Sequence, residues 1–323
     1  MKIRPYTALL AAILMLASCT KEEVQGVGKA MSFRMISEDS VSTRAANGIN
    51  DNATFIFPAD FTVAIDGTNY MFTANSAGTN MIGWSLVAFP VSGASVQVLS
   101  FYPALLDDTQ IQSFTVRNNQ SQTNVGTNNY RISDLMVGMP AANGTTISWG
   151  AGTWNGLDGN GKVKPTEDAI PLVFEHKMVK IRVNVNTNSA TVKQIRMINV
   201  KRSIDFDTKD ITFSNLDTAD DGLGDNVIMY DDITGTKANF VCTALIPKQD
   251  LTEDTPFIEV VLGATPSDVT LTYTLHADAN FNPGKQYIYN LDVSMDKLDV
   301  SCSIADWNTS PAEWTDVIET IRI

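Results

Sequence analysis

Apolar and polar residues alternate in short runs along most of this chain, a period typical of strands that bury one face. Residues 30–36 put Met31, Phe33 and Met35 on one face, with polar side chains between them. A polar loop follows at residues 37–53, where turn-forming residues end the alternation. The first element is therefore predicted to be a half-buried strand with an exposed loop after it.

Short strand candidates continue to the end of the chain, separated by clusters of turn-forming residues. No segment has the apolar period of a long amphipathic helix, and residues 141–168 are expected to form hairpins or a long surface loop. Strands at this spacing predict an all-β sandwich or barrel. The candidates are 54–57, 61–66, 69–73, 84–89, 95–101, 111–116, 192–200, 204–206, 211–213, 227–230, 238–246, 257–262, 269–275 and 287–293.

A long apolar run at residues 170–185 changes its alternation near Val179, as a β-bulge would do. The length of 323 residues corresponds to about two domains at roughly 100–200 residues each. We therefore place a domain boundary just before this run. One domain is expected at 30–169 and the other at 170–323.

The N-terminus has the pattern of an export signal. Two basic residues precede an apolar run at residues 8–17, about half of the roughly 20 residues that a membrane-spanning helix needs. Small residues then lead directly to Cys19, as in the lipobox where bacterial lipoproteins are acylated and cleaved. We expect residues 1–18 to be removed, Cys19 to carry the lipid and residues 19–29 to form a tether. A plain signal peptide with an incidental cysteine is the alternative.

The amino-acid composition favours strands and argues against one class of binding partner. Charged residues make up 18% of the chain and apolar residues 44%, a balance that favours strands over a helical bundle. The net charge of -13 argues against a nucleic-acid partner, because neutralising phosphates requires clustered Lys and Arg. Cys242 and Cys302 lie in strand-like runs and are expected to be buried small hydrophobes, with a disulfide in an oxidising compartment as the alternative.

The sequence offers no recognisable catalytic constellation. His176 shares a strand face with Phe174 and Met178, which favours a packed structural role over that of a general base. Its only other histidine, His276, lies far along the chain, and neither GxSxG, HExxH nor a paired metal-ligand spacing occurs. We therefore expect no enzymatic activity and no cofactor.

Two loop features are weaker candidates for ligand binding. In the register of a calcium-binding loop, Asp217 and Asp221 fit the first and fifth positions, but the third and twelfth lack an oxygen ligand. A solvated acidic turn is therefore the favoured interpretation. Trp149 and Trp154 could stack on a sugar ring, although packing within a hairpin or the core is favoured.

Several segments, in this order, resemble the fimbrillin family, which are lipoprotein pilins of the type V kind. The matching segments are LASC–TKEE at 16–23, SFRMIS and STRAA within 32–46, SDLMVG at 133–138, IPLVFEHKMVKIRVNV at 170–185 and NPGKQYIYNLDVSMDKLDVSCSIADW at 282–307. Together they extend from one end of the chain to the other. The resemblance implies two tandem transthyretin-like (Greek-key) β-sandwich domains.

The resemblance also implies a route of assembly. The lipoprotein precursor reaches the cell surface, an Arg-specific protease cuts in the loop after the first strand, and a strand of another subunit replaces the one that leaves. Arg44, followed by Ala45, suits that cut, so that residues 30–44 would be discarded; a solvated loop charge is the alternative. Loss of the first strand would uncover unpaired backbone groups, which invite strand addition.

Residues 313–323 are the candidate donor strand. Val317, Ile321 and Ile323 share one parity, but Glu319 interrupts it, and an unpaired buried carboxylate is costly. Eleven residues at about 3.3 Å each reach roughly 36 Å, enough to line one edge of a sheet. The alternative is that this segment is simply the last strand of its own domain.

The resemblance implies a structural subunit of surface fimbriae that supports adhesion. Its expected locations are the fimbrium and, as a lipid-anchored precursor, the cell outer membrane. Its expected partners are other fimbrial subunits, the outer membrane, the processing protease and a host or bacterial surface ligand. The alternative function is that of a membrane-anchored, monomeric adhesin or glycan-binding lipoprotein of the tip or accessory type.

Overall fold

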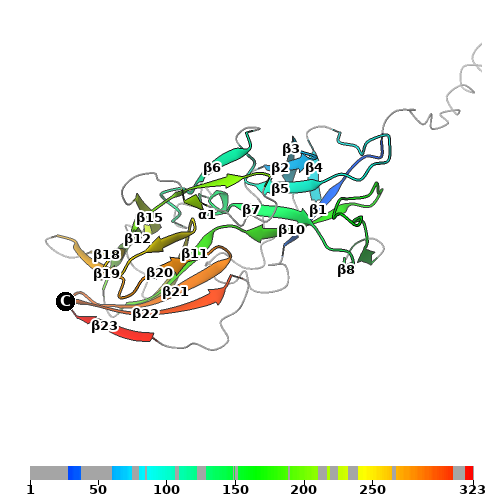
Figure 1. Ribbon diagram of the computed structural model, residues 1–323. Coiled ribbons are helices and arrows are strands. Elements are labelled where there is room, and N and C mark those ends of the chain that lie inside the picture. The colour runs from blue at the N-terminus through cyan, green and yellow to red at the C-terminus, as the bar shows by residue number, and fades with distance from the viewer. Residues whose placement is uncertain are drawn as a thin grey trace, which may run out of the picture.

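The computed structural model is built almost wholly of β-strands, as the alternation of apolar and polar residues predicted. Among the described residues the only helix is α1 (Asn129–Ile132), and none is long and apolar enough to cross a membrane. Figure 1 shows two groups of strands that follow one another along an elongated molecule. The structure describes residues 28–37, 60–74, 80–83, 86–105, 109–121, 129–147, 149, 152–187, 190–209, 217–218, 225–231, 239–263, 267–307 and 317–322.

The N-terminal strands form a closed barrel of seven strands, each with a neighbour on both sides. Inward-facing residues such as Phe33, Phe61 and Phe72 fill it, and each is at most 3% exposed. The resemblance implied a sandwich here, but the sheet closes because its first strand pairs with two others. The order is β1 (Phe33–Ser37), β10 (Ile170–His176), β7 (Met136–Pro140), β5 (Val98–Tyr102), β2 (Phe61–Ile65), β3 (Thr68–Ala74) and β4 (Asn80–Gly83).

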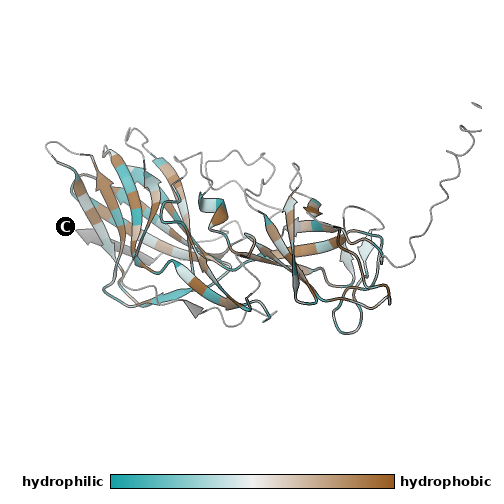
Figure 2. Cartoon of the chain, turned by 90° about the horizontal axis from the view of Figure 1, so that it is seen from above, coloured by the Kyte–Doolittle hydropathy of each residue, from teal (hydrophilic) through white to brown (hydrophobic). Residues whose placement is uncertain are grey.

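The C-terminal strands form two sheets that share one core. Tyr289 of the larger sheet lies 5.6 Å from Phe257 and 5.9 Å from Tyr273 of the smaller sheet, measured between ring centroids. Figure 2 shows hydrophobic and hydrophilic residues alternating along these strands. The larger sheet has the order β16 (Asn239–Ile246), β11 (Val179–Thr187), β21 (Lys285–Val293), β22 (Lys297–Asp306) and β23 (Val317–Arg322); the smaller has β15 (Asp225–Asp231), β12 (Val192–Val200), β18 (Pro256–Leu262) and β19 (Val269–Thr274).

The chain passes from the barrel to the sandwich within the apolar run that was predicted to open the second domain. The first part of that run, β10, pairs with β1 and β7 in the barrel, whereas β11 pairs with β16 and β21 in the sandwich. The boundary predicted just before residue 170 is therefore wrong, and the change of parity is a switch between sheets at Lys177–Met178 rather than a bulge. No turn-forming residue marks this switch, so the alternation alone could not distinguish a switch between sheets from a bulge within one strand.

Further pairings tie the two halves together. Strand β6 (Ile111–Thr115) pairs with β13 (Ser203–Asp207), which also pairs with β14 (Asp217–Thr218). Leu99, Phe101 and Val137 of the barrel strands belong to the hydrophobic core of the sandwich. Two small ladders complete the described strands: β8 (Thr145–Thr146) with β9 (Thr153–Trp154), as expected for a hairpin in 141–168, and β17 (Gln249–Leu251) with β20 (Ala279–Phe281).

The two cysteines of the sandwich are free; Cys242 is buried, as predicted, whereas Cys302 is only half-buried. Cys242 and Cys302 stand in one row across the larger sheet, separated by Val183 and Tyr289 on the two strands between them. Three strand spacings of about 4.8 Å keep them roughly 14 Å apart, too far for a disulfide. Burial raises the pKa of both thiols, and for Cys302 a hydrogen bond with Tyr289 opposes that rise.

A side chain covers one edge of the larger sheet. Gln120 is only 1% exposed, and its amide nitrogen donates to the Leu245 carbonyl at 2.9 Å. Its amide oxygen accepts from the Leu245 N–H at 2.8 Å. Leu245 lies in β16, whose partner on the other side is β11. The glutamine therefore pairs with this edge as the peptide group of another strand would.

Gln120→Ala is expected to lower the free energy of unfolding by about 2–4 kcal/mol, because the buried N–H and C=O of Leu245 both lose their partner. Urea unfolding followed by circular dichroism measures this loss. The control is Gln97→Ala at an exposed position, expected to change stability by less than about 0.5 kcal/mol. Equal losses in the two variants would show that the amide does not secure this edge.

Candidate functional site

The strand predicted to be displaced, β1, has a paired strand on each side in the barrel. It runs parallel to β10, with Phe33 opposite Ile170 and Ser37 opposite Phe174. On its other side it runs antiparallel to β4, with Phe33 opposite Met81. The barrel is closed by these two ladders, so β1 is the seam of the sheet.

Backbone hydrogen bonds continue along the chain before β1. The Met31 N–H donates to the Val87 carbonyl at 2.8 Å, and the Phe89 N–H donates to the Lys29 carbonyl at 2.8 Å. Within the segment predicted as a strand at 84–89, residues 86–89 make only an isolated bridge, between Ala88 and Ala30. The N-terminal segment is therefore held by backbone contacts from Lys29 onward.

The alternation predicted for this strand is confirmed by the burial of its side chains. Met31 and Met35 are each 8% exposed and Phe33 is 1% exposed. The Phe33 ring stands edge-on to Phe72, with centroids 5.2 Å apart and planes at 88°. Burying side chains of this kind contributes about 1.5–3 kcal/mol each, so this strand is a substantial part of the barrel core.

We call the space that β1 fills between β10 and β4 its seat. Side chains of β10 and β7 form one wall of this seat. Phe174 packs against Phe61 with ring centroids 5.6 Å apart. Gly138 on β7 lies under the Phe174 ring, where an added Cβ would stand 2.7 Å from a ring carbon. Only glycine leaves room for this ring, which explains the residue opposite Phe174 in the ladder. These contacts of Phe174 do not involve β1.

Without β1, the two flanking strands would each present an unpaired backbone row. They would stand two strand spacings apart, about 9.6 Å, which is the width that one strand fills. An incoming strand would have to pair with β10 and β4 together and place an apolar side chain at alternate positions. The geometry can therefore receive an extended segment of chain.

A single segment of chain connects β1 to the other strands of the barrel. Along the sequence, β1 joins β2 only through residues 38–60. The predicted cut between Arg44 and Ala45 falls in this connection, but both residues lie outside the described part of the chain, as does Cys19. One cut there would leave β1 attached to the barrel by non-covalent contacts alone.

The candidate donor strand is found at the edge of its own sandwich. Strand β23 runs antiparallel to β22, with Val317 opposite Cys302 and Ile321 opposite Leu298. It is the outermost strand of the larger sheet, and Figure 1 shows it beyond β22. Ile323 lies outside the described residues. In the single chain this segment is thus the last strand of its own domain, the alternative noted above.

The weak calcium candidate gains no support. Asp217 begins strand β14, where only the backbone is described, and Asp221 lies outside the described residues. Across the described ranges, no group of three or more His, Cys, Asp and Glu side chains is arranged to hold a metal ion. The acidic turn remains the interpretation of this segment.

A sequence model described as fimbrillin-like matches residues 43–307, most of the chain. The chain belongs to this fimbrillin-like family. The resemblance inferred from its sequence segments is thereby confirmed. No curated protein sequence matches the chain.

Solved structures share the fold of this fimbrillin-like chain. A candidate cell adhesion protein from Bacteroides uniformis aligns with a TM-score of 0.55 at 13% identity, over 86% of this chain and 98% of its own. A second, from Bacteroides ovatus, aligns with a TM-score of 0.57 at 13% identity, over 88% of this chain and 99% of its own. At such low identity the likeness concerns the fold alone.

Three segments that carried the family resemblance meet where the fimbrillin-like chain leaves the barrel. The His176 Nδ1 lies 2.9 and 3.0 Å from the two carboxylate oxygens of Asp134, and its ring stacks on Trp307 with centroids 4.1 Å apart. His176 is therefore a packed structural residue, as predicted. Sequence reasoning missed its two partners, although both lie in quoted segments: Asp134 in SDLMVG and Trp307 at the end of SIADW.

Phe33→Ala is expected to destabilise the full, uncleaved chain by about 3–5 kcal/mol, because it empties the centre of the barrel seam. Urea unfolding measures the change. Ser32→Ala, one position away with an exposed side chain, is the matched control and is expected to change stability by less than about 0.5 kcal/mol. Two similar, small losses would mean that β1 does not stabilise the barrel in solution.

Proposed function

We propose that this chain is a structural subunit of surface fimbriae, not an enzyme, and that it assembles by exchanging β1 for a strand of another subunit. The observation that carries the proposal is the position of β1, a seam strand between β10 and β4 that joins β2 through a single connection. Membership of the fimbrillin-like family supports the same role. The subunit would contribute to adhesion as part of the fimbrium.

Proteolysis gives the exchange its direction. As long as β1 is joined to β2, it returns to its seat faster than a strand from another molecule can arrive, because the connection keeps it nearby. After a cut at Arg44 the strand is a separate peptide, which diffuses away once it leaves. The seat is then available to another subunit, and the lost strand does not compete.

Strand β23 is the proposed donor. In its own chain it has one neighbouring strand, β22, whereas in the vacated seat it would have two, β10 and β4. Each transfer would therefore exchange one backbone ladder for two. The family match supports this choice of segments, since it begins at residue 43 and ends at Trp307, leaving both β1 and β23 outside.

The precursor is proposed to reach the outer membrane as a lipoprotein acylated on Cys19. Its partners would be an Arg-specific protease during maturation and other fimbrial subunits in the polymer. The excess of acidic over basic residues, which remains after residues 1–18 are removed, would favour the solubility of such a surface protein before it assembles. Anchoring and polymerisation would then be successive states of one chain.

Fimbriae purified from the cell surface are expected to contain an unacylated chain that begins at Ala45, determined by N-terminal sequencing and intact mass. Arg44→Ala is expected to keep the chain acylated at Cys19 and to abolish polymers, because β1 stays tethered. Arg34→Lys, which removes the nearby arginine of β1, is the control and should be processed normally. Fimbriae assembled from chains that start at acylated Cys19 would contradict the removal of β1.

Deletion of residues 313–323 is expected to abolish polymers and leave the monomer folded, because β23 lies at the edge of its sheet. Electron microscopy and thermal unfolding measure the two effects. A finer test is Ile321→Asp, which puts a charge on the proposed inward parity, against Thr320→Asp on the other parity. Failure of the truncated chain to fold, or equal assembly of the two point variants, would reject β23 as donor.

A further inference from the structure

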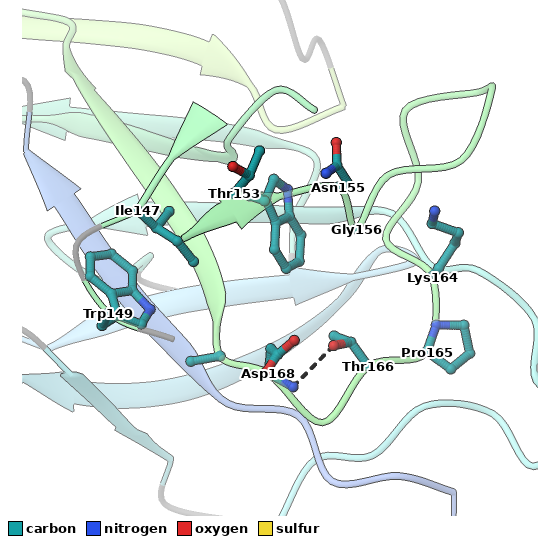
Figure 3. A pocket seen from close by; sticks show the side chains of 11 residues that line it. Ile147, Trp149, Thr153, Asn155, Gly156, Lys164, Pro165, Thr166 and Asp168 are labelled. Atoms are coloured by element: carbon teal, nitrogen blue, oxygen red, sulfur yellow. Dashed lines mark hydrogen bonds between the residues drawn. The ribbon is translucent and has the colours of Figure 1, made fainter. Parts of the chain in front are cut away.

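A cavity of about 450 Å³ lies between the β8–β9 hairpin and the loop that leads to β10. Figure 3 shows Trp149 and Lys164 on opposite sides of it, with Asn155 at one end and Asp168 at the other. Its volume falls in the lower part of the range of small-molecule sites, roughly 300–1,000 Å³. The cavity is therefore of a size for a single small ligand.

Two tryptophans give the cavity its apolar surface. Trp154 is 4% exposed and its indole lies against Gly156, where an added Cβ would stand 2.2 Å from ring carbons. The glycine therefore lets the indole lie against the backbone, which fixes the ring in the wall. Trp149 is the second aromatic ring of the lining.

Both indoles have an unused hydrogen-bond donor. The Nε1–H groups of Trp149 and Trp154 are out of contact with solvent, and neither has an acceptor among the residues that the structure describes. An indole nitrogen can only donate, and a buried donor without a partner lowers stability. Because solvent does not reach these nitrogens, a ligand in the cavity would contact the carbon atoms of the rings rather than their N–H groups.

The remaining polar groups favour an uncharged ligand. Lys164 and Asp168 are the only charged residues of the lining and carry opposite charges. Asn155 offers an amide donor and acceptor, and the Thr166 hydroxyl accepts a hydrogen bond from the Asp168 N–H at 3.0 Å, as Figure 3 shows. A phosphate would need an excess of positive charge and a quaternary ammonium an excess of negative charge, and the lining has neither. A neutral saccharide, with apolar ring faces and hydroxyl groups, suits the aromatic lining, the Asn155 amide and the balanced charge.

One face of Trp149 is covered by the seam strand. The Arg34 Cζ lies 4.2 Å from the centroid of the Trp149 ring, the geometry of a cation–π contact. Arg34 stands in β1 between the inward-facing Phe33 and Met35, so it belongs to the outer face of the barrel. Departure of β1 would remove the guanidinium and leave this aromatic face available.

We propose that this cavity binds a neutral mono- or disaccharide, with Trp149 as the stacking platform and Asn155 as a hydrogen-bonding partner. We further propose that Arg34 covers the platform until β1 leaves, a part that rests on the proposed function. Strand exchange would then expose the binding face as the subunit enters the fibre.

The test is calorimetric titration of the full, uncleaved chain with glucose, galactose, mannose, N-acetylglucosamine and their β-linked dimers. At least one sugar is expected to bind, and Trp149→Ala should weaken it about three- to tenfold. Arg34→Ala should bind the same sugar about two- to fivefold more tightly. The matched control is Trp307→Phe, in the junction with the sandwich, which should bind as the wild type does.

Asn155→Ala provides a second, milder variant in case Trp149→Ala does not fold, and it should also weaken binding. Absence of binding by every sugar to both the wild type and Arg34→Ala would overturn the site. So would binding that neither cavity variant weakens. Binding that Arg34→Ala leaves unchanged would overturn the covering role. These measurements need no polymer, so failure of fimbrial assembly with intact sugar binding would reject strand exchange alone.

Discussion

The closure of the barrel by β1 is the constraint on which the rest of this structure depends. A closed sheet has no unpaired edge, so the strand at the seam must satisfy two backbone ladders and fill the core from one face. Phe33 fills the core, with 1% of its surface exposed. Removing such a strand would break two ladders and open the core, so the stability of the barrel depends on it.

The halves of the molecule are joined by side-chain contacts in addition to the β6–β13 ladder. His176 binds Asp134 of the barrel segment and stacks on Trp307 at the end of β22, so three distant segments are fixed at the point where the chain changes sheets. Gln120 adds a second tie by pairing with Leu245 across the two halves. A force along the molecule would therefore act on packed contacts, which is what a subunit of a fibre requires.

The two edge strands of the larger sheet, β16 and β23, have different hydrogen-bond partners. At β16 the backbone of Leu245 is occupied by the Gln120 amide, which blocks further pairing there. At the opposite edge β23 is joined to β22 alone. One edge is thus hydrogen-bonded to a side chain at Leu245, and the other edge is the strand β23 itself. The cavity lined by Trp149 lies beside the same seam, because Arg34 of β1 stacks on the Trp149 ring.

Local alternation determined much of this protein from sequence alone: the all-β class, the inward parity of Met31, Phe33 and Met35, and the buried state of Cys242, because side chains alternate across any strand whatever its neighbours. Alternation carries no information on which strands pair. The parallel ladder of β1 with β10, the switch of sheets after His176 and the contact of Arg34 with Trp149 each join residues far apart in the sequence. Only the tertiary structure decided them, because backbone hydrogen bonding accepts any partner and the packing of side chains selects one.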